Sequence, residues 1–399
     1  MGTGVFFNLP AYGHVNPTLP VVRNLVARGE RILYFDTLEF KEKIEATGAE
    51  FRDYGFGMPA VAENRRKGGN FVQLAGVLLG AAEKGLPHYI EEVERLAPDY
   101  IIHDSMCPWG KYIAGYLGIR AINTTSTFVF TKGTLGKAGG FGGKVVKMAR
   151  ESGAAGVSAV LRSKKKLERQ YGLKIGIMDI FRNTENLNLV FTSRYFQPGG
   201  DDFGAEYEFI GPSIAERNDA PGFAFDFAAA DPLVYISLGT LENDRRDFYV
   251  RCIKAFAGMG VHVLISIGRN VKREELGSIP PNISVVEYAP QLEVLKHAQL
   301  FLSHAGMNSV NESLYFGVPL LLFPQQQEQV MVARRVEELG AGICMPADGA
   351  DSGDIRAASR TVLESRNFYE NARKVSDSFK ASGGYERGAE LILRYVSTG

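Results

Sequence analysis

Residues 300–309 read LFLSHAGMNS, and this stretch decides the fold class. The apolar run Leu300–Ser303 is typical of a buried strand, because parallel strands covered on both faces show little polar alternation. The turn His304-Ala305-Gly306 follows, and Asn308–Phe316 then has the spacing of a helix. The stretch therefore predicts one strand–turn–helix unit, the building block of α/β proteins.

The same unit recurs on both sides of this stretch. In the C-terminal half, the other runs predicted as strands are Leu233–Leu238, His262–Ile267, Ile283–Glu287 and Pro319–Phe323. In the N-terminal half they are Val5–Leu9, Arg31–Phe35, Tyr100–His103, a strand that Gly118–Ile122 leads into, and Leu187–Thr192. Helical stretches separate most of these runs. Strands that alternate with helices predict βαβ units and therefore a doubly wound parallel sheet in each half.

The length of the chain favours two domains. It has 399 residues, and a domain typically has roughly 100–200. We expect a Rossmann-like domain over residues 1–206, a linker over 207–227 and a second Rossmann-like domain over 228–382. Ligands of open α/β sheets bind at the carboxyl ends of the strands. Two such sheets that face each other would form one interdomain cleft.

Composition excludes several classes of function. The 45 basic and 45 acidic side chains give a formal net charge of zero, so nothing indicates nucleic-acid binding or a polybasic membrane arm. Cys107, Cys252 and Cys344 form no C-x-x-C pair, which argues against a zinc site, and their odd number argues against a disulfide framework. We see no signal peptide and no run of about 18 apolar residues. We therefore expect a cytoplasmic protein without stable membrane insertion.

The turn at 304–306 is predicted to bind an anion. Gly306 allows the backbone to approach a ligand closely. The helix that follows has free N–H groups and the positive end of its dipole at its first turn. His304, Asn308 and Ser309 add side-chain donors. Together these groups could hold a diphosphate without a metal ion.

Neighbouring polar residues suit the rest of a nucleotide sugar. Glu312 lies one turn into the same helix, and a carboxylate accepts hydrogen bonds well from the two hydroxyls of a ribose. Tyr288 offers a flat face to a base, and Gln291 offers a donor and an acceptor. Glu328 and Gln329 stand at a later loop-to-helix junction, where they could bind sugar hydroxyls.

The run from Tyr288 to Gln329 resembles the donor-binding signature of family 1 glycosyltransferases, which have the GT-B fold. Residues 8–19 (NLPAYGHVNPTL) resemble the opening loop of the family, and residues 236–240 (ISLGT) resemble the first strand and turn of its second domain. The likeness is greatest to bacterial macrolide- and flavonoid-type glucosyltransferases. It implies two facing Rossmann-like domains, the first binding an acceptor and the second a nucleotide sugar. It also implies that residues 383–399 form a helix that packs back on the first domain.

The resemblance implies a role for each matching residue. Tyr288 stacks on uracil, Gln291 touches the base or ribose, and Glu312 binds the ribose hydroxyls. The residues implied to hold the diphosphate are His304, Asn308 and Ser309, with Ser237 and Thr240 closing over it. Those implied to bind the sugar are Glu328 and Gln329. The chain departs from plant members of the family at Tyr288 and Met307, where those proteins usually have tryptophan. A tyrosine ring can still stack on a base.

A base for the acceptor is predicted at His14, in a loop after the first strand that ends where Pro17 starts a helix. Asp104 follows the strand Tyr100–His103, so it emerges at the same edge of the sheet and could orient the imidazole. Asp104 could equally cap the following segment. The family independently pairs a histidine and an aspartate at these positions. His103 is expected to pack on the other face of the sheet.

The resulting hypothesis is a single displacement that inverts the anomeric carbon. His14 takes the proton of an acceptor hydroxyl, which attacks glucose carried by UDP. UDP-glucose is then a co-substrate, and we expect no prosthetic group. The chain has no Asp-x-Asp pair, the usual manganese-binding motif of the other common glycosyltransferase fold, so we also expect no metal requirement.

The sequence says least about the acceptor. A small lipophilic molecule such as a phenol, flavonoid, macrolide or terpenoid is expected, and residues 133–150 could form a flap over it. Apolar side chains near the relevant loops are candidates for its pocket, although each is more often a core residue: Met58, Phe71, Leu78, Met106, Trp109, Phe128, Phe130 and Phe141.

Three alternatives stay open. A sugar-nucleotide epimerase or hydrolase of the same fold would need no base such as His14. A dinucleotide-dependent oxidoreductase is disfavoured, because Gly2-x-Gly4 precedes the first strand and does not follow it. A non-catalytic binding protein is disfavoured by the presence of His14, Asp104 and Glu312.

Overall fold

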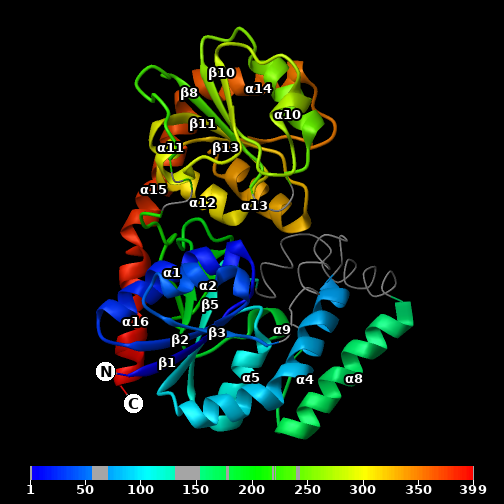
Figure 1. The fold of residues 1–399 in the computed structure, drawn as a ribbon, viewed down its shortest axis with the longest axis vertical. Coiled ribbons are helices and arrows are strands. Elements are labelled where there is room, and N and C mark those ends of the chain that lie inside the picture. The colour runs from blue at the N-terminus through cyan, green and yellow to red at the C-terminus, as the bar shows by residue number, and fades with distance from the viewer. Residues whose placement is uncertain are drawn as a thin grey trace. The chain divides into compact units, whose positions relative to one another are not determined.

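The computed structural model describes residues 2–55, 71–130, 153–176, 179–217, 220, 222–239 and 243–398. They form two compact units. The first unit is Met1–Ser213 together with Ser382–Gly399, and the second is Ile214–Ala381. Figure 1 shows a sheet flanked by helices in each of them.

The first unit is built around a parallel sheet with strand order β3-β2-β1-β4-β5-β6-β7. Its strands are β1 (Thr3–Phe7), β2 (Arg31–Asp36), β3 (Glu50–Asp53), β4 (Tyr100–Asp104), β5 (Arg120–Thr125), β6 (Asn188–Val190) and β7 (Tyr207–Phe209). Its α-helices are α1 (Tyr12–Ala27), α2 (Lys41–Glu45), α4 (Phe71–Leu96), α5 (Pro108–Leu117), α8 (Gly153–Tyr171), α9 (Asp179–Arg182) and α16 (Gly384–Ser397).

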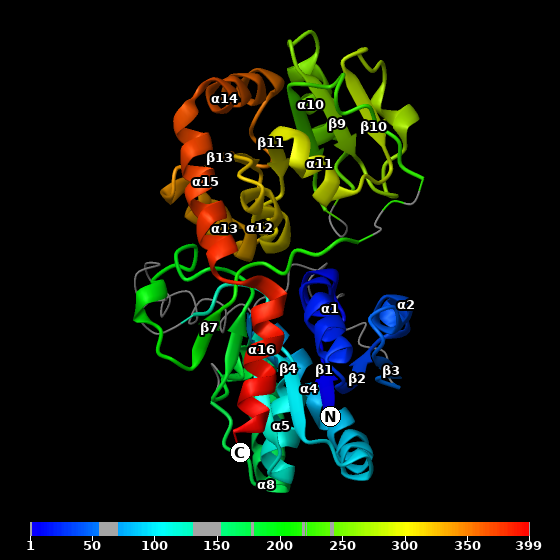
Figure 2. The same cartoon turned by 90° about the vertical axis from the view of Figure 1, so that its left-hand side faces the viewer.

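The central strands of this sheet are buried on both faces. In β1, Val5 and Phe7 point into a core formed with α4, α5 and α8, whereas Phe6 points into a core formed with α1 and α16. This alternation follows from the two-residue period of a strand. The last helix, α16, packs against α1 within this unit (Figure 2).

The second unit repeats the architecture with strand order β10-β9-β8-β11-β12-β13, again all parallel. Its strands are β8 (Leu233–Ser237), β9 (His262–Ser266), β10 (Ile283–Val286), β11 (Ala298–Ser303), β12 (Leu320–Leu322) and β13 (Gly342–Cys344). Its α-helices are α10 (Arg246–Phe256), α11 (Gln291–His297), α12 (Met307–Tyr315), α13 (Gln327–Glu338), α14 (Ser352–Glu364) and α15 (Arg366–Ala381). Helices α10 and α14 share a core with one face of the sheet, and α11 and α12 contact β11 on the other.

The α/β class with two doubly wound sheets is confirmed. Some boundaries differ from expectation. The stretch expected as a linker from residue 207 begins with β7, which is the edge strand of the first sheet. Helix α1 begins at Tyr12, not at Pro17, because the carbonyl of Ala11 accepts hydrogen bonds from the amides of His14 and Val15. None of the described helices is long and apolar enough to cross a bilayer.

Candidate active site

The structure brings His14 and Asp104 together in the first unit. His14 lies in the first turn of α1 rather than in a loop, and Asp104 is the last residue of β4. Strands β1 and β4 pair in parallel, so the segments that leave their carboxyl ends are neighbours. His14 Nδ1 lies 2.8 Å from Asp104 Oδ2, and the two residues are 4% and 1% exposed. This pair has the geometry of an imidazole oriented by a carboxylate.

Asp104 serves two partners at once. Its Oδ1 accepts a hydrogen bond of 2.7 Å from the amide of Met106, while its Oδ2 faces His14. The aspartate therefore fixes the turn after β4 but does not cap α5, whose N-cap position is Cys107. An Nδ1–H that points at a carboxylate leaves Nε2 as the lone-pair nitrogen, which is the form of histidine that accepts a proton.

Ser126 completes this cluster, and sequence reasoning missed it. Its Oγ lies 3.1 Å from His14 Nδ1, and the residue is buried. Ser126 directly follows β5, the strand next to β4. The signal that identified Asp104, a polar side chain at the end of a buried strand, applies equally to Ser126.

Other polar groups lie buried at the same edge of the sheet. Tyr34 Oη is 2.7 Å from both Asn8 Nδ2 and Thr18 Oγ1. Burial raises the pKa of Asp36, at the end of β2, well above its usual range.

The residues expected in an acceptor pocket are dispersed. Trp109 and Leu78 lie in the hydrophobic core, where Trp109 packs edge-on against Tyr54, and Phe128 is buried against Phe196. Met106 and Phe130 are half-buried. Phe71 is the first residue of α4. Met58, Phe141 and the segment 133–150 lie outside the described residues.

His103, which was expected only to pack on the other face of the sheet, also makes polar contacts. Its Nε2 lies 3.2 Å from Glu185 Oε1, which also accepts a 2.8 Å hydrogen bond from Lys111 Nζ. Although burial opposes it, contact with His103 and Lys111 lowers the pKa of Glu185. This partly buried cluster links His103 of β4, the strand that carries Asp104, to Lys111 of α5 and to Glu185, which precedes β6.

In the second unit, a strained turn leads into α12. Ala305 is buried and has a φ of +66°, which is uncommon for a residue with a side chain. Gly306 is the N-cap of α12, and no side chain caps this end. Asn308 and Ser309 occupy the first turn and are half-buried. The amides of this first turn and the positive end of the helix dipole make the turn suited to an anion.

His304 is held at this turn by two glycines. A Cβ added to Gly239 would lie 2.7 Å from His304 Cε1, and one added to Gly306 would lie 2.5 Å from His304 Nε2. Its Nδ1 is buried without a hydrogen-bond partner among the described residues. Burial lowers the pKa of His304 to about 4, against a smaller opposite effect of Glu328. The imidazole is therefore neutral near pH 7 and close-packed.

The next predicted donor residues lie on two other elements of the second unit or outside the described residues. Ser237 ends β8 and is buried, and its Oγ accepts a 3.3 Å hydrogen bond from the amide of Gly239. Thr240 lies outside the described residues. Glu328 is half-buried in the first turn of α13, and Gln329 Oε1 accepts hydrogen bonds from the amides of Gln325 and Gln326. The side-chain carbonyl of Gln329 thus caps the N-terminus of α13.

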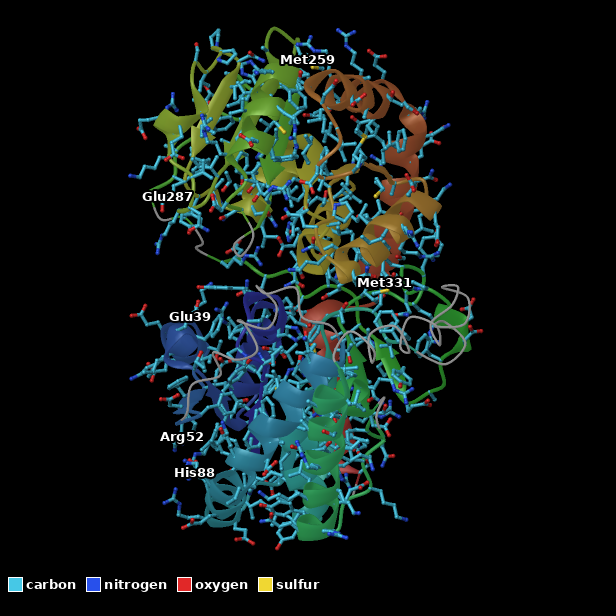
Figure 3. The ribbon with its side chains drawn as sticks, turned by 90° about the vertical axis from the view of Figure 1, so that its right-hand side faces the viewer. Glu39, Arg52, His88, Met259, Glu287 and Met331 are labelled. Carbon is cyan, nitrogen blue, oxygen red and sulfur yellow. The ribbon has the colours of Figure 1, made fainter. Side chains whose placement is uncertain are left out.

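Tyr288 and Glu312 have well-defined partners. The Tyr288 ring is 38% exposed, and the guanidinium of Arg269 lies 5.4 Å from its centroid. Arg269 also pairs with Glu287, which Figure 3 shows on the surface of this unit. Glu312 accepts a 2.6 Å hydrogen bond from Gln291 Nε2 and pairs with Arg217 at 2.8 Å.

The chain resembles known enzymes over its whole length. Residues 251–384 match the family described as erythromycin biosynthesis protein CIII-like, C-terminal domain. A Bacillus subtilis protein named uncharacterized UDP-glucosyltransferase YojK is 34% identical over 413 residues, which cover 99% of this chain and 98% of that protein. The chain belongs to the family 1 UDP-glycosyltransferases with the GT-B fold. It is therefore a glycosyltransferase.

Further comparisons agree with this assignment of the glycosyltransferase. The oleandomycin glycosyltransferase of Streptomyces antibioticus is 28% identical, over 97% of this chain and 89% of its own. The solved structure of CalG4, the calicheamicin glycosyltransferase, matches with a TM-score of 0.84 and 28% identity, covering 100% of this chain and 98% of that one. Both support a GT-B enzyme with two Rossmann-like domains.

Two residues of the second unit of this glycosyltransferase could not be identified from the sequence. Gly239 was read only as part of a turn, although its missing side chain leaves the space that His304 fills. Arg217 stood in the expected linker, where no periodic pattern indicates a contact. Its partner Glu312 lies far away in the sequence, so only the folded chain brings the two together.

Proposed function

We propose that this glycosyltransferase moves glucose from UDP-glucose to a hydroxyl group of a small lipophilic acceptor, with inversion at the anomeric carbon. The observation that carries the proposal is the buried contact of 2.8 Å between His14 and Asp104. A histidine has an unperturbed pKa suited to proton transfer near neutral pH, and an adjacent carboxylate stabilises its charged form. An oxygen nucleophile needs such a base.

In the proposed reaction His14 Nε2 takes the proton of the acceptor hydroxyl. The acceptor oxygen forms a bond to the anomeric carbon while the bond from that carbon to the UDP oxygen breaks. UDP leaves with the electron pair of that bond. Asp104 stabilises the imidazolium, and the amides of the first turn of α12 with His304 stabilise the charge on the diphosphate. The proposal assigns no step to a metal ion.

UDP and glucose are supported by two kinds of observation. Two Bacillus subtilis relatives, YojK and YdhE, are named UDP-glucosyltransferases. In this chain Glu312 offers two buried carboxylate oxygens for ribose hydroxyls, and Tyr288 offers an exposed ring for a base. A spinosyn rhamnosyltransferase of the same fold, 21% identical, was solved with thymidine diphosphate, so thymidine nucleotides are the alternative to test.

The acceptor class is supported by the names of relatives. They include an oleandomycin glycosyltransferase, a demethyllactenocin mycarosyltransferase and a zeaxanthin glucosyltransferase. Each name refers to a small organic acceptor or product. We therefore propose a phenol, flavonoid, macrolide or terpenoid alcohol as the substrate.

The test is a transfer assay read by mass spectrometry. UDP-glucose and TDP-glucose are each incubated with a panel of phenols, flavonoids and macrolides, with UDP release measured in parallel. We expect a β-glucoside from UDP-glucose and UDP release that depends on the acceptor. UDP release at the same rate without acceptor would favour the hydrolase alternative.

The variant His14→Ala tests the mechanism. We expect it to lose about 10²–10⁴-fold in kcat, the usual contribution of a general base, while it keeps its affinity for UDP. His88→Ala, which changes an exposed histidine of α4, is the matched control and should keep full activity. Unchanged turnover in His14→Ala would remove the proposed mechanism.

A further inference from the structure

Glu312 is held by two partners from different parts of the second unit. Arg217 Nη1 lies 2.8 Å from Glu312 Oε1, and Gln291 Nε2 donates a 2.6 Å hydrogen bond to Oε2. The Glu312 side chain is 7% exposed and that of Arg217 is 27% exposed. A carboxylate this buried needs compensation for its lost hydration, and a guanidinium at hydrogen-bond distance provides it.

The pair stands beside a group of buried hydroxyls. Tyr235 in β8 stacks on Phe301, and its hydroxyl is close enough to Ser237 and Ser266 to hydrogen-bond with them. The charges of Glu312 and Arg217 both act on the pKa of Tyr235, which burial raises to about 12. Arg217 therefore reaches the polar interior of the proposed donor site and is not a surface charge.

We propose that Arg217 is a positioning residue that gives the enzyme selectivity for ribonucleoside diphosphates over their 2′-deoxy counterparts. It does so by holding the carboxylate of Glu312 in the one orientation that accepts both ribose hydroxyls. This inference rests on the proposed function, in which Glu312 binds the ribose. The inference adds Arg217 to the proposed donor site and makes that site selective between ribonucleotides and 2′-deoxyribonucleotides.

The acceptor capacity of Glu312 explains the selectivity. A carboxylate has about four lone-pair positions, two on each oxygen. Within the part of the chain that the structure describes, Arg217 takes one on Oε1 and Gln291 takes one on Oε2. One position on each oxygen is left, which matches the two O–H donors of a ribose. A 2′-deoxyribose brings one donor and leaves the other buried position unpaired, which is unfavourable.

The guanidinium group is suited to this task. Its donors form a rigid planar fork, so Arg217 fixes the plane of the carboxylate as well as its charge. Without Arg217, Glu312 keeps only the amide of Gln291 and can rotate about its side-chain bonds. A rotated carboxylate still accepts one hydroxyl but no longer presents two oxygens to two neighbouring hydroxyls. Loss of Arg217 should therefore weaken UDP binding more than dUDP binding.

The experiment measures binding of UDP and dUDP to the full-length enzyme by isothermal titration calorimetry. These ligands share the base and differ only in the 2′-hydroxyl. For the unaltered enzyme we expect UDP to bind at least about 10-fold more tightly, the effect of leaving a buried acceptor unpaired. In Arg217→Gln we expect this ratio to fall to about 2 or less, while the affinity for dUDP changes less than about 3-fold.

Three further variants show whether Arg217 acts through Glu312. Arg269→Gln removes another arginine of this unit, one that contacts Tyr288, and should leave the UDP-to-dUDP ratio unchanged. Glu312→Gln should lose the ratio, and the double variant with Arg217→Gln should lose no more than either single one. Arg217→Lys keeps the charge without the planar fork, so it should restore only part of the ratio. Arg217→Lys also provides the test of the inference if Arg217→Gln does not fold.

The outcomes separate this inference from the proposed function. An equal loss of UDP and dUDP affinity in Arg217→Gln would overturn it and leave Arg217 with a structural role only. A gain in affinity for both would also overturn it, because Arg217 would then occupy the place of the ribose. If the unaltered enzyme binds UDP and dUDP equally, the inference fails while the proposed function stands. If it binds neither, the proposed function fails as well.

Discussion

His14 Nδ1 and Asp104 Oδ2 lie 2.8 Å apart in the interior of the first unit, with almost no exposure of either residue. The topology produces this contact. β1 and β4 are adjacent parallel strands, and His14 and Asp104 come from the segments at their carboxyl ends. A buried carboxylate at this distance determines which imidazole nitrogen carries the proton, and so which one is free to act as a base.

Replacing Asp104 with asparagine should lower kcat strongly with little effect on donor binding. An amide cannot stabilise the imidazolium, and it can favour the wrong tautomer of His14. We expect a loss of roughly 10²–10⁴-fold in kcat and a KM for UDP-glucose within about 3-fold of the unaltered value. Steady-state kinetics check this. An active Asp104→Asn enzyme would show that His14 needs no orienting carboxylate.

Ser126→Ala should have a much smaller effect. Ser126 Oγ is 3.1 Å from the same nitrogen, but a hydroxyl is neutral and more distant than Asp104 Oδ2. A neutral hydrogen bond contributes about 0.5–1.5 kcal/mol, so we expect a loss of roughly 2–10-fold in kcat. Ser158→Ala is the control, because among the described residues the Ser158 hydroxyl donates to Ala155 of its own helix. A loss as large as that of Asp104→Asn would make Ser126 an equal partner in the site.

That His14 and Asp104 are neighbours could be predicted from the sequence, because polar residues at strand ends follow physical regularities. Parallel strands are buried on both faces, so they appear as apolar runs, and polar residues directly after them collect at one edge. That argument placed Asp104 near His14. The start of α1 was predicted wrongly, because proline is favoured at the first position of a helix and so indicates Pro17, whereas this helix already begins at Tyr12.

Packing between distant segments could not be predicted in the same way. Helix α4 was missed because Gly76, Gly80 and Pro87 interrupt its pattern, and such residues usually mark turns. Tertiary burial of Leu78 and Leu79 in the core overrides that local tendency. The Arg217–Glu312 pair was missed for a related reason, since an arginine in an irregular segment carries no periodic signal of its partner.

Removal of metal ions should leave the transferase activity intact. The proposed leaving-group stabilisation comes from the amides of α12 and from His304, and the sequence contains no Asp-x-Asp motif. After exhaustive dialysis against EDTA we expect the rate of glucoside formation to stay within about 2-fold of that of the untreated enzyme. Loss of activity that manganese restores would contradict this prediction.

Gly239→Ala should destabilise the second unit and weaken the proposed donor site. Gly239 has a φ of +76°, and its new Cβ would lie 2.7 Å from His304 Cε1, so the ring must move. We expect a destabilisation of about 1–3 kcal/mol and a raised KM for UDP-glucose. Gly258→Ala is a matched control, because φ is +68° there but, its chain neighbours aside, no atom of the described residues lies within 4 Å of the new Cβ. If both variants have the same KM, contact with His304 does not matter for the donor.

The last prediction concerns the protonation of His304. Burial lowers its pKa in the folded enzyme to about 4 from 6.5. Between about pH 6.5 and 4 the unfolded chain therefore binds a proton that the folded chain does not. Since stability rises with pH wherever the unfolded state binds more protons, this residue lowers stability as the pH falls through that window. The full effect is roughly 3 kcal/mol. Urea unfolding curves measured across this pH window should show it for the unaltered enzyme and not for His304→Gln.

A bound diphosphate should reverse this shift, because its negative charge favours the imidazolium form. The histidine Cε1–H signals of the labelled enzyme give the direct measurement, with His304→Gln identifying the signal of His304. That signal should titrate near pH 4 in the free enzyme and at a higher pH when UDP is saturating, so UDP binding at pH 5 should take up protons. His262→Gln, which removes an exposed histidine of β9, should change neither result. A His304 signal that titrates identically with and without UDP would show that this ring does not contact the diphosphate.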